Sequence, residues 1–237
     1  MTETVVITGA NRGLGLALAT ACSARGDHVI AGCRDPRTAA DLAAVTGDVF
    51  AVDMGDESSI ARFVDAVTDR VGGGAIDIVV NNAGIDARNL GAADSERNVL
   101  VQRGDHVLGQ VAVNAVGPML LARGLVDLLR RSDRPRIVNM SSQIGSMQVA
   151  STIGSDVGYA VSKAALNMIT IKFSTSLRDD GITAVVMHPG HLRTDMGGPG
   201  GAMAADDAAG QITELIDRLT LDDTGSFLRW DGTTHPW

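Results

Sequence analysis

The sequence contains one tyrosine, Tyr159, and one of its two lysines, Lys163, follows four residues later in "GYAVSKAALN" (158–167). Residues four apart on a helix lie on the same face, so this spacing predicts a phenol and an ammonium group at one site. An unperturbed phenol has a pKa of about 10, and a nearby cation favours its ionised form. We therefore expect Lys163 to lower the pKa of Tyr159, which would act as general acid for a carbonyl oxygen or general base for an alcohol.

Two other polar residues are candidates for the same site. Ser142 follows an expected strand in "RIVNMSS" and is a candidate second donor to the carbonyl oxygen, with Ser141 as the alternative. Asn114 lies in an expected helix, where asparagine is unfavourable unless its amide holds a backbone group or a water. Each residue alone is more often structural. The prediction of a site rests on their presence together with Tyr159 and Lys163.

A glycine-rich stretch, "TGANRGLG" (8–15), lies between the first expected strand and the first expected helix. Glycines at 9, 13 and 15 would let the backbone turn sharply and let a phosphate approach the free N–H groups of the helix start. The alternative is a tight turn that only packs against the sheet. The position of the stretch in a strand–turn–helix unit favours dinucleotide binding.

The end of the second expected strand indicates which dinucleotide is preferred. An acidic residue there would bind both ribose hydroxyls of NAD, whereas an arginine would bind the 2′-phosphate of NADP. Cys33 is followed by Arg34, and Arg12 lies in the glycine-rich stretch, so NADP is favoured and NAD is the weaker alternative. Asp35 could pair with Arg34 and weaken this preference. Both arginines could also be surface charges.

Strands and helices are expected to alternate along the whole chain, which predicts one α/β domain over 1–237 with a doubly wound parallel sheet and helices on both faces. The expected strands are near-continuous apolar runs at 4–8, 28–33, 48–53, 76–81, 135–141 and 182–187, with a weaker one at 225–230. The expected helices cover 14–26, 36–45, 57–71, 105–131, 156–179 and 206–219.

Composition excludes several classes of function. No segment approaches the roughly 20 uncharged apolar residues of a membrane span, and the N-terminus has no export signal, which predicts a cytoplasmic protein. The net charge of −8 and the lack of a long basic cluster argue against nucleic acid. The five histidines lack metal-site spacing, and Cys22 and Cys33 are expected to be buried thiols.

Several motifs, in family order over nearly the whole chain, resemble the short-chain dehydrogenase/reductase family, whose fold is of the Rossmann type. They are "TGANRGLG", Asp53, "NNAG" (81–84), Asn114, Ser142, "YAVSK" (159–163) and "HPGHLRT" (188–194). The C-terminal stretches "RTDMGGPGGAMAADDAA" and "LTLDDTGSFLRWDGTTHPW" are similar to the C-factor and sniffer-type carbonyl reductase branch.

The resemblance implies a role for each matching residue. Tyr159 would be the catalytic acid or base, Lys163 would lower its pKa and hold the nicotinamide ribose, Ser142 would orient the substrate carbonyl, and Asn114 would support a proton-relay water. Binding of the cofactor is implied for Gly9, Asn11, Arg12, Gly13, Leu14, Arg34, Asp53, Met54, Asn81, Ala83, Gly84, Tyr159, Lys163, Pro189, Leu192 and Thr194.

The resemblance implies an NADP(H)-dependent oxidoreductase that moves a hydride between nicotinamide and a carbonyl or secondary alcohol. The alternative is a non-catalytic dinucleotide-binding signalling protein on the same fold. Sixteen residues separate Ser142 from Tyr159, more than is usual in the family, and residues 85–105 and His191 also depart from its pattern. These loops are expected to shape the substrate pocket. The oligomeric state stays open, with a homodimer or homotetramer among the alternatives.

Overall fold

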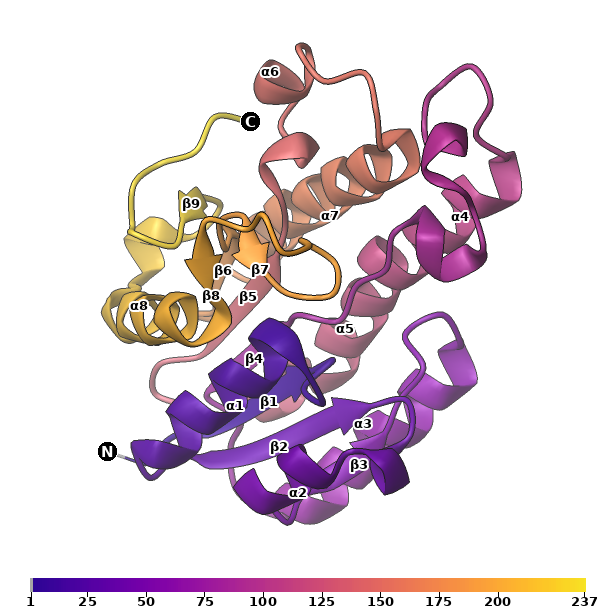
Figure 1. Ribbon diagram of the computed structural model, residues 1–237. Helices are drawn as coiled ribbons and strands as arrows, with labels where there is room; N and C mark the ends of the chain where they lie inside the picture. Colours follow the sequence, from indigo (N-terminus) through magenta and orange to yellow (C-terminus); the bar gives the residue numbers. More distant parts are fainter. Residues whose placement is uncertain (1) are drawn as a thin grey trace.

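A seven-stranded parallel sheet runs through the centre of the molecule in the computed structural model, which describes residues 2–237 (Figure 1). From one edge to the other the strands are β3 (Val49–Ala51), β2 (His28–Cys33), β1 (Thr4–Thr8), β4 (Ile78–Asn81), β5 (Arg136–Met140), β6 (Thr183–His188) and β9 (Phe227–Arg229). The chain builds outward from β1 in one direction and then from β4 in the other. This reversal leaves a crevice beyond the carboxyl ends of the two strands, where α/β proteins bind ligands.

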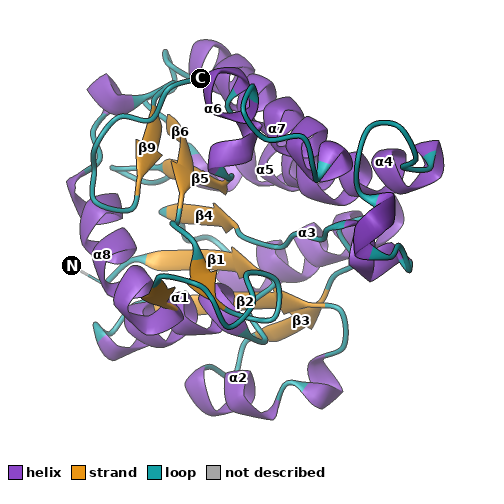
Figure 2. Ribbon diagram, turned by 45° about the horizontal axis from the view of Figure 1, so that its top comes forward, coloured by secondary structure: helices purple, strands orange, loops and turns teal. Residues whose placement is uncertain are grey.

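Helices cover both faces of the sheet, which confirms the predicted doubly wound α/β fold (Figure 2). Helices α1 (Gly13–Ala24), α2 (Ala40–Val45) and α8 (Ala205–Arg218) pack on one face, and α3 (Glu57–Val71), α5 (Gly117–Leu129) and α7 (Val157–Ser176) pack on the other. Two shorter helices, α4 (Gly104–Val111) and α6 (Met147–Ala150), precede α5 and α7.

The strands are apolar on both sides because each side faces a helical layer. In β1, Val5 and Ile7 join the core beneath α1 and α8, whereas Val6 between them joins the core beneath α3 and α5. All three side chains are fully buried. Alternation of side chains across a strand therefore fills two cores at once, which explains the unbroken apolar runs of the sequence.

The predicted helix over 105–131 is one continuous helix over 104–129, but it is not α-helical throughout. It consists of α4, a π-helical turn over Ala112–Val116, and α5. Asn114 lies in the π-helical turn, and its side chain binds both backbone groups of Ile85. This tertiary contact favours a wider turn that sequence periodicity does not reveal. The structure also adds a small parallel pair, β7 (Leu192–Arg193) and β8 (Met203–Ala204), that was not predicted.

The helix Gly104–Leu129 is long enough to span a membrane, and an 18-residue window within it is apolar enough by composition, with a mean hydropathy of 1.4. Asp105, Arg123 and Asp127 interrupt it, so it does not reach the roughly 20 uncharged apolar residues of a membrane span. Leu121, Leu125 and Leu129 of this segment are fully buried against the sheet side of the protein. Core helices of α/β proteins meet the same criterion, so this composition is weak evidence for a membrane segment.

Replacing Leu125 by alanine should lower the free energy of unfolding by about 3 kcal/mol, because it leaves a cavity in a closely packed core. Leu108→Ala is the matched control, since that side chain is 70% exposed on α4. The control should cost less than about 1 kcal/mol. Urea unfolding of both variants measures the difference, and equal losses would contradict the assignment of α5 to the core.

Candidate active site

A cleft of about 1100 Å³ lies at the carboxyl ends of the central strands. It begins at the turn between β1 and α1 and continues past the ends of β4, β5 and β6 to the first turn of α7. Most predicted site residues line it: Gly9, Asn11, Arg12, Gly13, Leu14, Arg34, Asp53, Met54, Ala83, Gly84, Ser142, Tyr159, Lys163, Pro189, Leu192 and Thr194. The fold thus brings together residues from seven separate stretches of sequence.

The glycine-rich stretch forms a cradle in which side chains would collide with backbone. Gly9 has a φ of +65°, and a Cβ atom there would lie 2.8 Å from Cα of Ala83. A Cβ atom on Gly15 would lie 2.2 Å from the carbonyl oxygen of Gly9. Glycine is therefore required at both positions, and the backbone stays open to a ligand at the start of α1.

The "NNAG" motif fixes the far wall of this cradle. Thr8 Oγ1 accepts hydrogen bonds from the backbone N–H groups of Asn82 and Ala83, both at 3.2 Å. The Asn82 amide in turn donates to the carbonyl oxygens of Thr8 and Gly9. Asn82 lines the cleft, whereas the predicted Asn81 is not among the lining residues.

Asn81 is instead part of a buried hydrogen-bond chain behind the cleft. Its Nδ2 donates to Oδ1 of Asn139, the residue opposite it on β5, at 2.8 Å. Nδ2 of Asn139 donates to Thr170 Oγ1 on α7, also at 2.8 Å. Asn81 therefore connects β4 and β5 to α7 from behind the cleft, and its contact with a cofactor stays a prediction.

The two arginines expected near the ribose differ in their surroundings. Asp35 binds Arg37 through two hydrogen bonds of 2.9 and 3.0 Å, so it does not pair with Arg34. Among residues 2–237, the exposed Arg34 makes no side-chain hydrogen bond or ion pair. Arg12 forms a 2.9 Å ion pair with Asp195, and both side chains are more than half exposed. Arg34 is thus the more available cation at this end of the cleft.

Tyr159 and Lys163 lie together in the first two turns of α7, as their spacing predicts. The Lys163 Nζ atom is 5.5 Å from the centre of the Tyr159 ring and donates a 2.8 Å hydrogen bond to the carbonyl oxygen of Met140. Lys163 is only 3% exposed. A buried ammonium group held by a strand-end carbonyl faces the same cleft as the phenol.

The expected lowering of the Tyr159 pKa is not found. Burial raises the pKa of Tyr159 well above its usual value, and the negative charges of Asp86 and Asp156 raise it further. Burial also lowers the pKa of Lys163, to about 8. Desolvation is the largest cause of both pKa shifts, because a site with little water favours the neutral form of each group over its ion. In the protein without ligand, the phenol is therefore firmly protonated at neutral pH.

The structure distinguishes the two candidate serines. Ser141 Oγ donates to Asn167 Oδ1 at 2.7 Å in the core, so its hydroxyl proton is already used. Ser142 is half-buried at the cleft, and within residues 2–237 its hydroxyl takes part in one hydrogen bond, a weak one of 3.4 Å accepted from the Ile144 N–H. The Ser142 hydroxyl remains available to donate to a ligand, whereas Ser141 has a structural role.

Asn114 is fully buried and is not among the residues that line the cleft. Its Nδ2 donates to the carbonyl oxygen of Ile85 at 2.8 Å and to Ser162 Oγ at 2.9 Å. Its Oδ1 accepts from the N–H of Ile85. Both amide protons are therefore used in joining the end of β4 to α7, so the side chain cannot also donate to a water.

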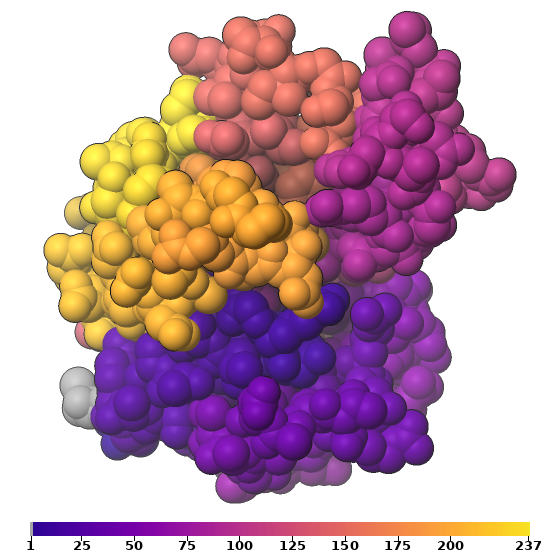
Figure 3. Space-filling model, viewed as in Figure 1, coloured from indigo at the N-terminus to yellow at the C-terminus, as the bar shows by residue number. Residues whose placement is uncertain are grey.

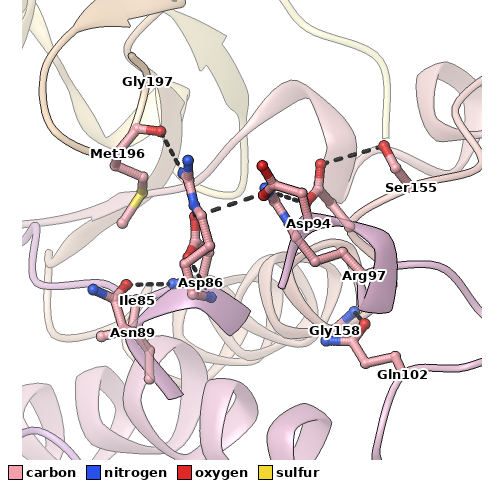
Figure 4. Close-up of polar contacts among 12 residues, drawn as sticks. Ile85, Asp86, Asn89, Asp94, Arg97, Gln102, Ser155, Gly158, Met196 and Gly197 are labelled. Carbon is pink, nitrogen blue, oxygen red and sulfur yellow. Dashed lines mark hydrogen bonds and ion pairs between the residues drawn. The ribbon is translucent and has the colours of Figure 1, made fainter. Parts of the chain in front are cut away.

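Charged residues that motif analysis missed lie on the substrate side of the cleft (Figure 4). Asp86 is almost fully buried and accepts two hydrogen bonds from Arg88. Arg88 Nη2 also donates a 2.8 Å hydrogen bond to the carbonyl oxygen of Met196 across the cleft. Asp86 and Arg88 lie in the stretch over 85–105, which departs from the family pattern, so no motif could have indicated them.

The segment over 190–204 lies across the cleft from the residues of 85–90. In Figure 3 its orange atoms lie directly against the indigo N-terminal region, with the magenta segment on the other side. The Arg12–Asp195 pair and the Arg88–Met196 bond hold this segment from two sides. His191, one of the flagged departures, binds the Gly197 carbonyl oxygen within the same segment at 2.8 Å.

The cleft therefore has two chemically different ends. One offers a backbone cradle and a free arginine, which suit a phosphorylated dinucleotide. The other offers a protonated phenol, an ammonium group and a free serine hydroxyl, which suit proton transfer to an oxygen atom.

Comparisons with known proteins agree with this arrangement. The short chain dehydrogenase family model matches residues 3–204. The "C-signal" protein of Myxococcus xanthus is 33% identical over 164 residues, which are 69% of this chain and 94% of that protein. The "1-hydroxy-2-glutathionyl-2-methyl-3-butene dehydrogenase" of Rhodococcus sp. (strain AD45) is 30% identical over 241 residues, 99% of this chain and 100% of the relative.

Two solved structures resemble the whole chain. The NADPH-bound carbonyl reductase from chicken fatty liver has a TM-score of 0.89 and 29% identity, covering 100% of this chain and 99% of that one. The carbonyl reductase Sniffer of D. melanogaster has a TM-score of 0.90 and 29% identity, with both chains fully covered. The fold, the cleft and these matches together show that the chain belongs to the short-chain dehydrogenase/reductase family, and that within it the chain resembles the sniffer-type carbonyl reductases.

Proposed function

We propose that this protein is an NADP(H)-dependent reductase of ketones or aldehydes, with Tyr159 as the general acid. The observation that carries the proposal is the position of Tyr159 and Lys163 at the opposite end of one cleft from the glycine cradle. A dinucleotide bound along the cleft would extend from the cradle toward this pair. The oxidoreductase family to which the chain belongs supports the same chemistry.

The residues present fit a dinucleotide. The cradle at Gly9 and Gly15 leaves backbone exposed where a Cβ atom would collide, and the N-terminus of α1 points at the same place. Gly9, Asn11, Gly13 and Leu14 would hold the pyrophosphate, and Pro189, Leu192 and Thr194 would border the nicotinamide. When bound, the cofactor supplies the hydride. The chain supplies orientation and the proton.

Protonation of Tyr159 at neutral pH suits the direction of reduction. A general acid must carry its proton before it can donate it to the carbonyl oxygen, and burial keeps this phenol protonated. Ser142 would donate a second hydrogen bond to the same oxygen and fix its position. Lys163, with a pKa of about 8, is mostly cationic at neutral pH and would stabilise negative charge near the phenol.

NADP is preferred over NAD in this proposal because Arg34 is available to a 2′-phosphate. Two structurally similar proteins support the preference: the chicken carbonyl reductase carries NADPH, and a short-chain dehydrogenase/reductase from Burkholderia multivorans, with 26% identity and a TM-score of 0.82, carries NADP. Binding of NAD remains the weaker alternative, since the ribose site holds no feature that excludes it.

A non-catalytic signalling role is the second candidate, and the name of the C-signal relative favours considering it. A signalling protein has no chemical need for a half-buried Tyr159, a buried Lys163 and an available Ser142 hydroxyl that all face one cleft. A turnover assay separates the two candidates. The proposal also takes the protein to be cytoplasmic and its partners to be small molecules rather than nucleic acid or membranes. The net charge of −8 argues against nucleic acid as a partner.

Tyr159→Phe should lower kcat with NADPH by at least about 100-fold, because the phenylalanine cannot donate a proton. Loss of NADPH absorbance with a panel of aldehydes, ketones and quinones measures turnover. Affinity for NADPH, followed by its fluorescence, should change little because the ring is retained. Unchanged turnover in the phenylalanine variant would overturn the assignment of the general acid.

Arg34→Ala should raise the KM for NADPH by about tenfold or more and leave the KM for NADH nearly unchanged, because a charge-assisted hydrogen bond to the 2′-phosphate is lost. Arg178→Ala, which removes an exposed arginine outside the cleft, is the control. Equal effects on NADPH and NADH would mean that Arg34 does not contact the 2′-phosphate.

Alkaline titration of near-ultraviolet absorbance reports Tyr159 alone, because the chain contains one tyrosine. Ionisation should begin well above pH 10 in the ligand-free protein. Asp156→Asn removes one negative charge that raises the pKa of the phenol, so the titration should move to lower pH. Asp207→Asn, which changes an exposed carboxylate on α8 outside the cleft, should leave the titration in place. A shift in the opposite direction with Asp156→Asn would contradict this account.

A further inference from the structure

Helix α7 carries Tyr159 in its first turn, yet the residue before the helix does not cap it. Asp156 has a φ of 61° and a ψ of 36°, and its side chain makes no capping hydrogen bond. Among residues 2–237, it is the only non-glycine residue with a positive φ. The first N–H groups of a helix have no partner within the helix, so α7 needs acceptors from elsewhere.

The segment over 97–102 supplies these acceptors. The backbone N–H of Val157 donates to the carbonyl oxygen of Arg97 at 3.1 Å. The N–H of Gly158 donates to Oε1 of Gln102 at 2.9 Å, and Figure 4 shows this side chain directed at the start of α7. Gln102 thus occupies the role of a capping side chain although it lies 56 residues away in sequence.

The close fit at Gly158 indicates that this contact is built into the packing. A Cβ atom on Gly158 would lie 2.3 Å from Nε2 of Gln110 and 2.9 Å from Nε2 of Gln102. Gln110 is fully buried on α4. The two glutamine amides therefore fill the space that any larger residue at 158 would need, and the first turn of α7 rests directly on them.

The side chain of Arg97 fixes the same segment from the other side. Its guanidinium group forms an ion pair with Asp156 and a 2.8 Å hydrogen bond with Asp94, and it lies 3.9 Å from Asp86. The Arg97 side chain is only 17% exposed. One residue therefore caps α7 through its backbone and holds the residue before α7 through its side chain.

We propose that Gln102 and Arg97 are positioning residues for Tyr159, acting by capping the N-terminus of α7 from the substrate-side loop. The proposal rests on the assignment of Tyr159 as general acid. Tyr159 follows the two capped residues directly, so loss of the caps lets the first turn fray and moves the phenol. The groups that face the phenol are Lys163 on α7, Asp86 on the loop after β4, and Asp156.

Gln102→Met tests the cap without changing charge. The variant should show faster hydrogen exchange at the amides of residues 157–159, because the Gly158 N–H loses its acceptor. Fraying should expose more of the half-buried phenol to water, so its alkaline titration should move down toward the ordinary pKa of 10.0. Turnover should fall by about fivefold, the effect of losing one helix cap, with the KM for NADPH unchanged.

Two further variants make the result specific. Gln102→Glu keeps an acceptor oxygen and should restore slow amide exchange at 157–159. Gln211→Met, the same change on the exposed surface of α8, should leave exchange, titration and turnover as in the wild type. Slow exchange and an unshifted titration in Gln102→Met, with the fold intact, would overturn the proposal.

The outcomes separate this proposal from the proposed function. Amide exchange and phenol titration need neither cofactor nor substrate, so they test the cap even if no substrate is turned over. Both measurements could confirm the cap while Tyr159→Phe still turns over substrate normally. That result would establish the cap and show that the general acid is misassigned. Faster exchange without any change in turnover would contradict the link between the cap and the phenol.

Discussion

Burial of the Lys163 ammonium group beside the Tyr159 phenol is the constraint on which the rest of the site depends. Removing both groups from water favours their neutral forms, so the surrounding structure must hold the ammonium group in place. The Met140 carbonyl oxygen at the end of β5 does this directly. The hydrogen-bond chain from Asn81 through Asn139 to Thr170 holds α7 against β4 and β5 one layer further in. The buried polar contacts at the carboxyl ends of β4 and β5 therefore fix the position of α7.

Much of the fold could be predicted because the sheet imposes a strong pattern on the sequence. Val5, Val6 and Ile7 all had to be apolar once both faces of β1 were covered, and β1 and β2 were predicted with their observed bounds. The π-helical turn at Asn114 was not predictable, because it depends on a contact with Ile85 that is remote in sequence. Hydrophobic periodicity shows which side chains of an element face the core, but it does not show contacts between that element and a loop.

The candidate site divides in the same way. The glycine cradle and the Tyr159–Lys163 pair are set by short spacings, which sequence shows directly. The prediction of a lowered pKa for Tyr159 was wrong because it considered only Lys163. Burial and the carboxylates of Asp86 and Asp156 all raise this pKa. Asn81 and Asn114 are predicted at the cofactor and its water, and their side-chain amides bond to neighbouring strands and helices. Motifs locate residues but do not say which of their atoms are already engaged.

The π-helical turn also sets the direction in which two helices face. It holds one residue more than an α-helical turn of similar height, so everything after it is rotated by about 100°. As a result α4 presents Gln110 to α7, whereas α5 presents Leu121 and Leu125 to the sheet. Deleting a single residue between 112 and 116 would turn thirteen residues of α5 away from their layer. The length of the stretch over 112–116 therefore fixes which side chains of α5 face the core, so this stretch is intolerant of insertion or deletion.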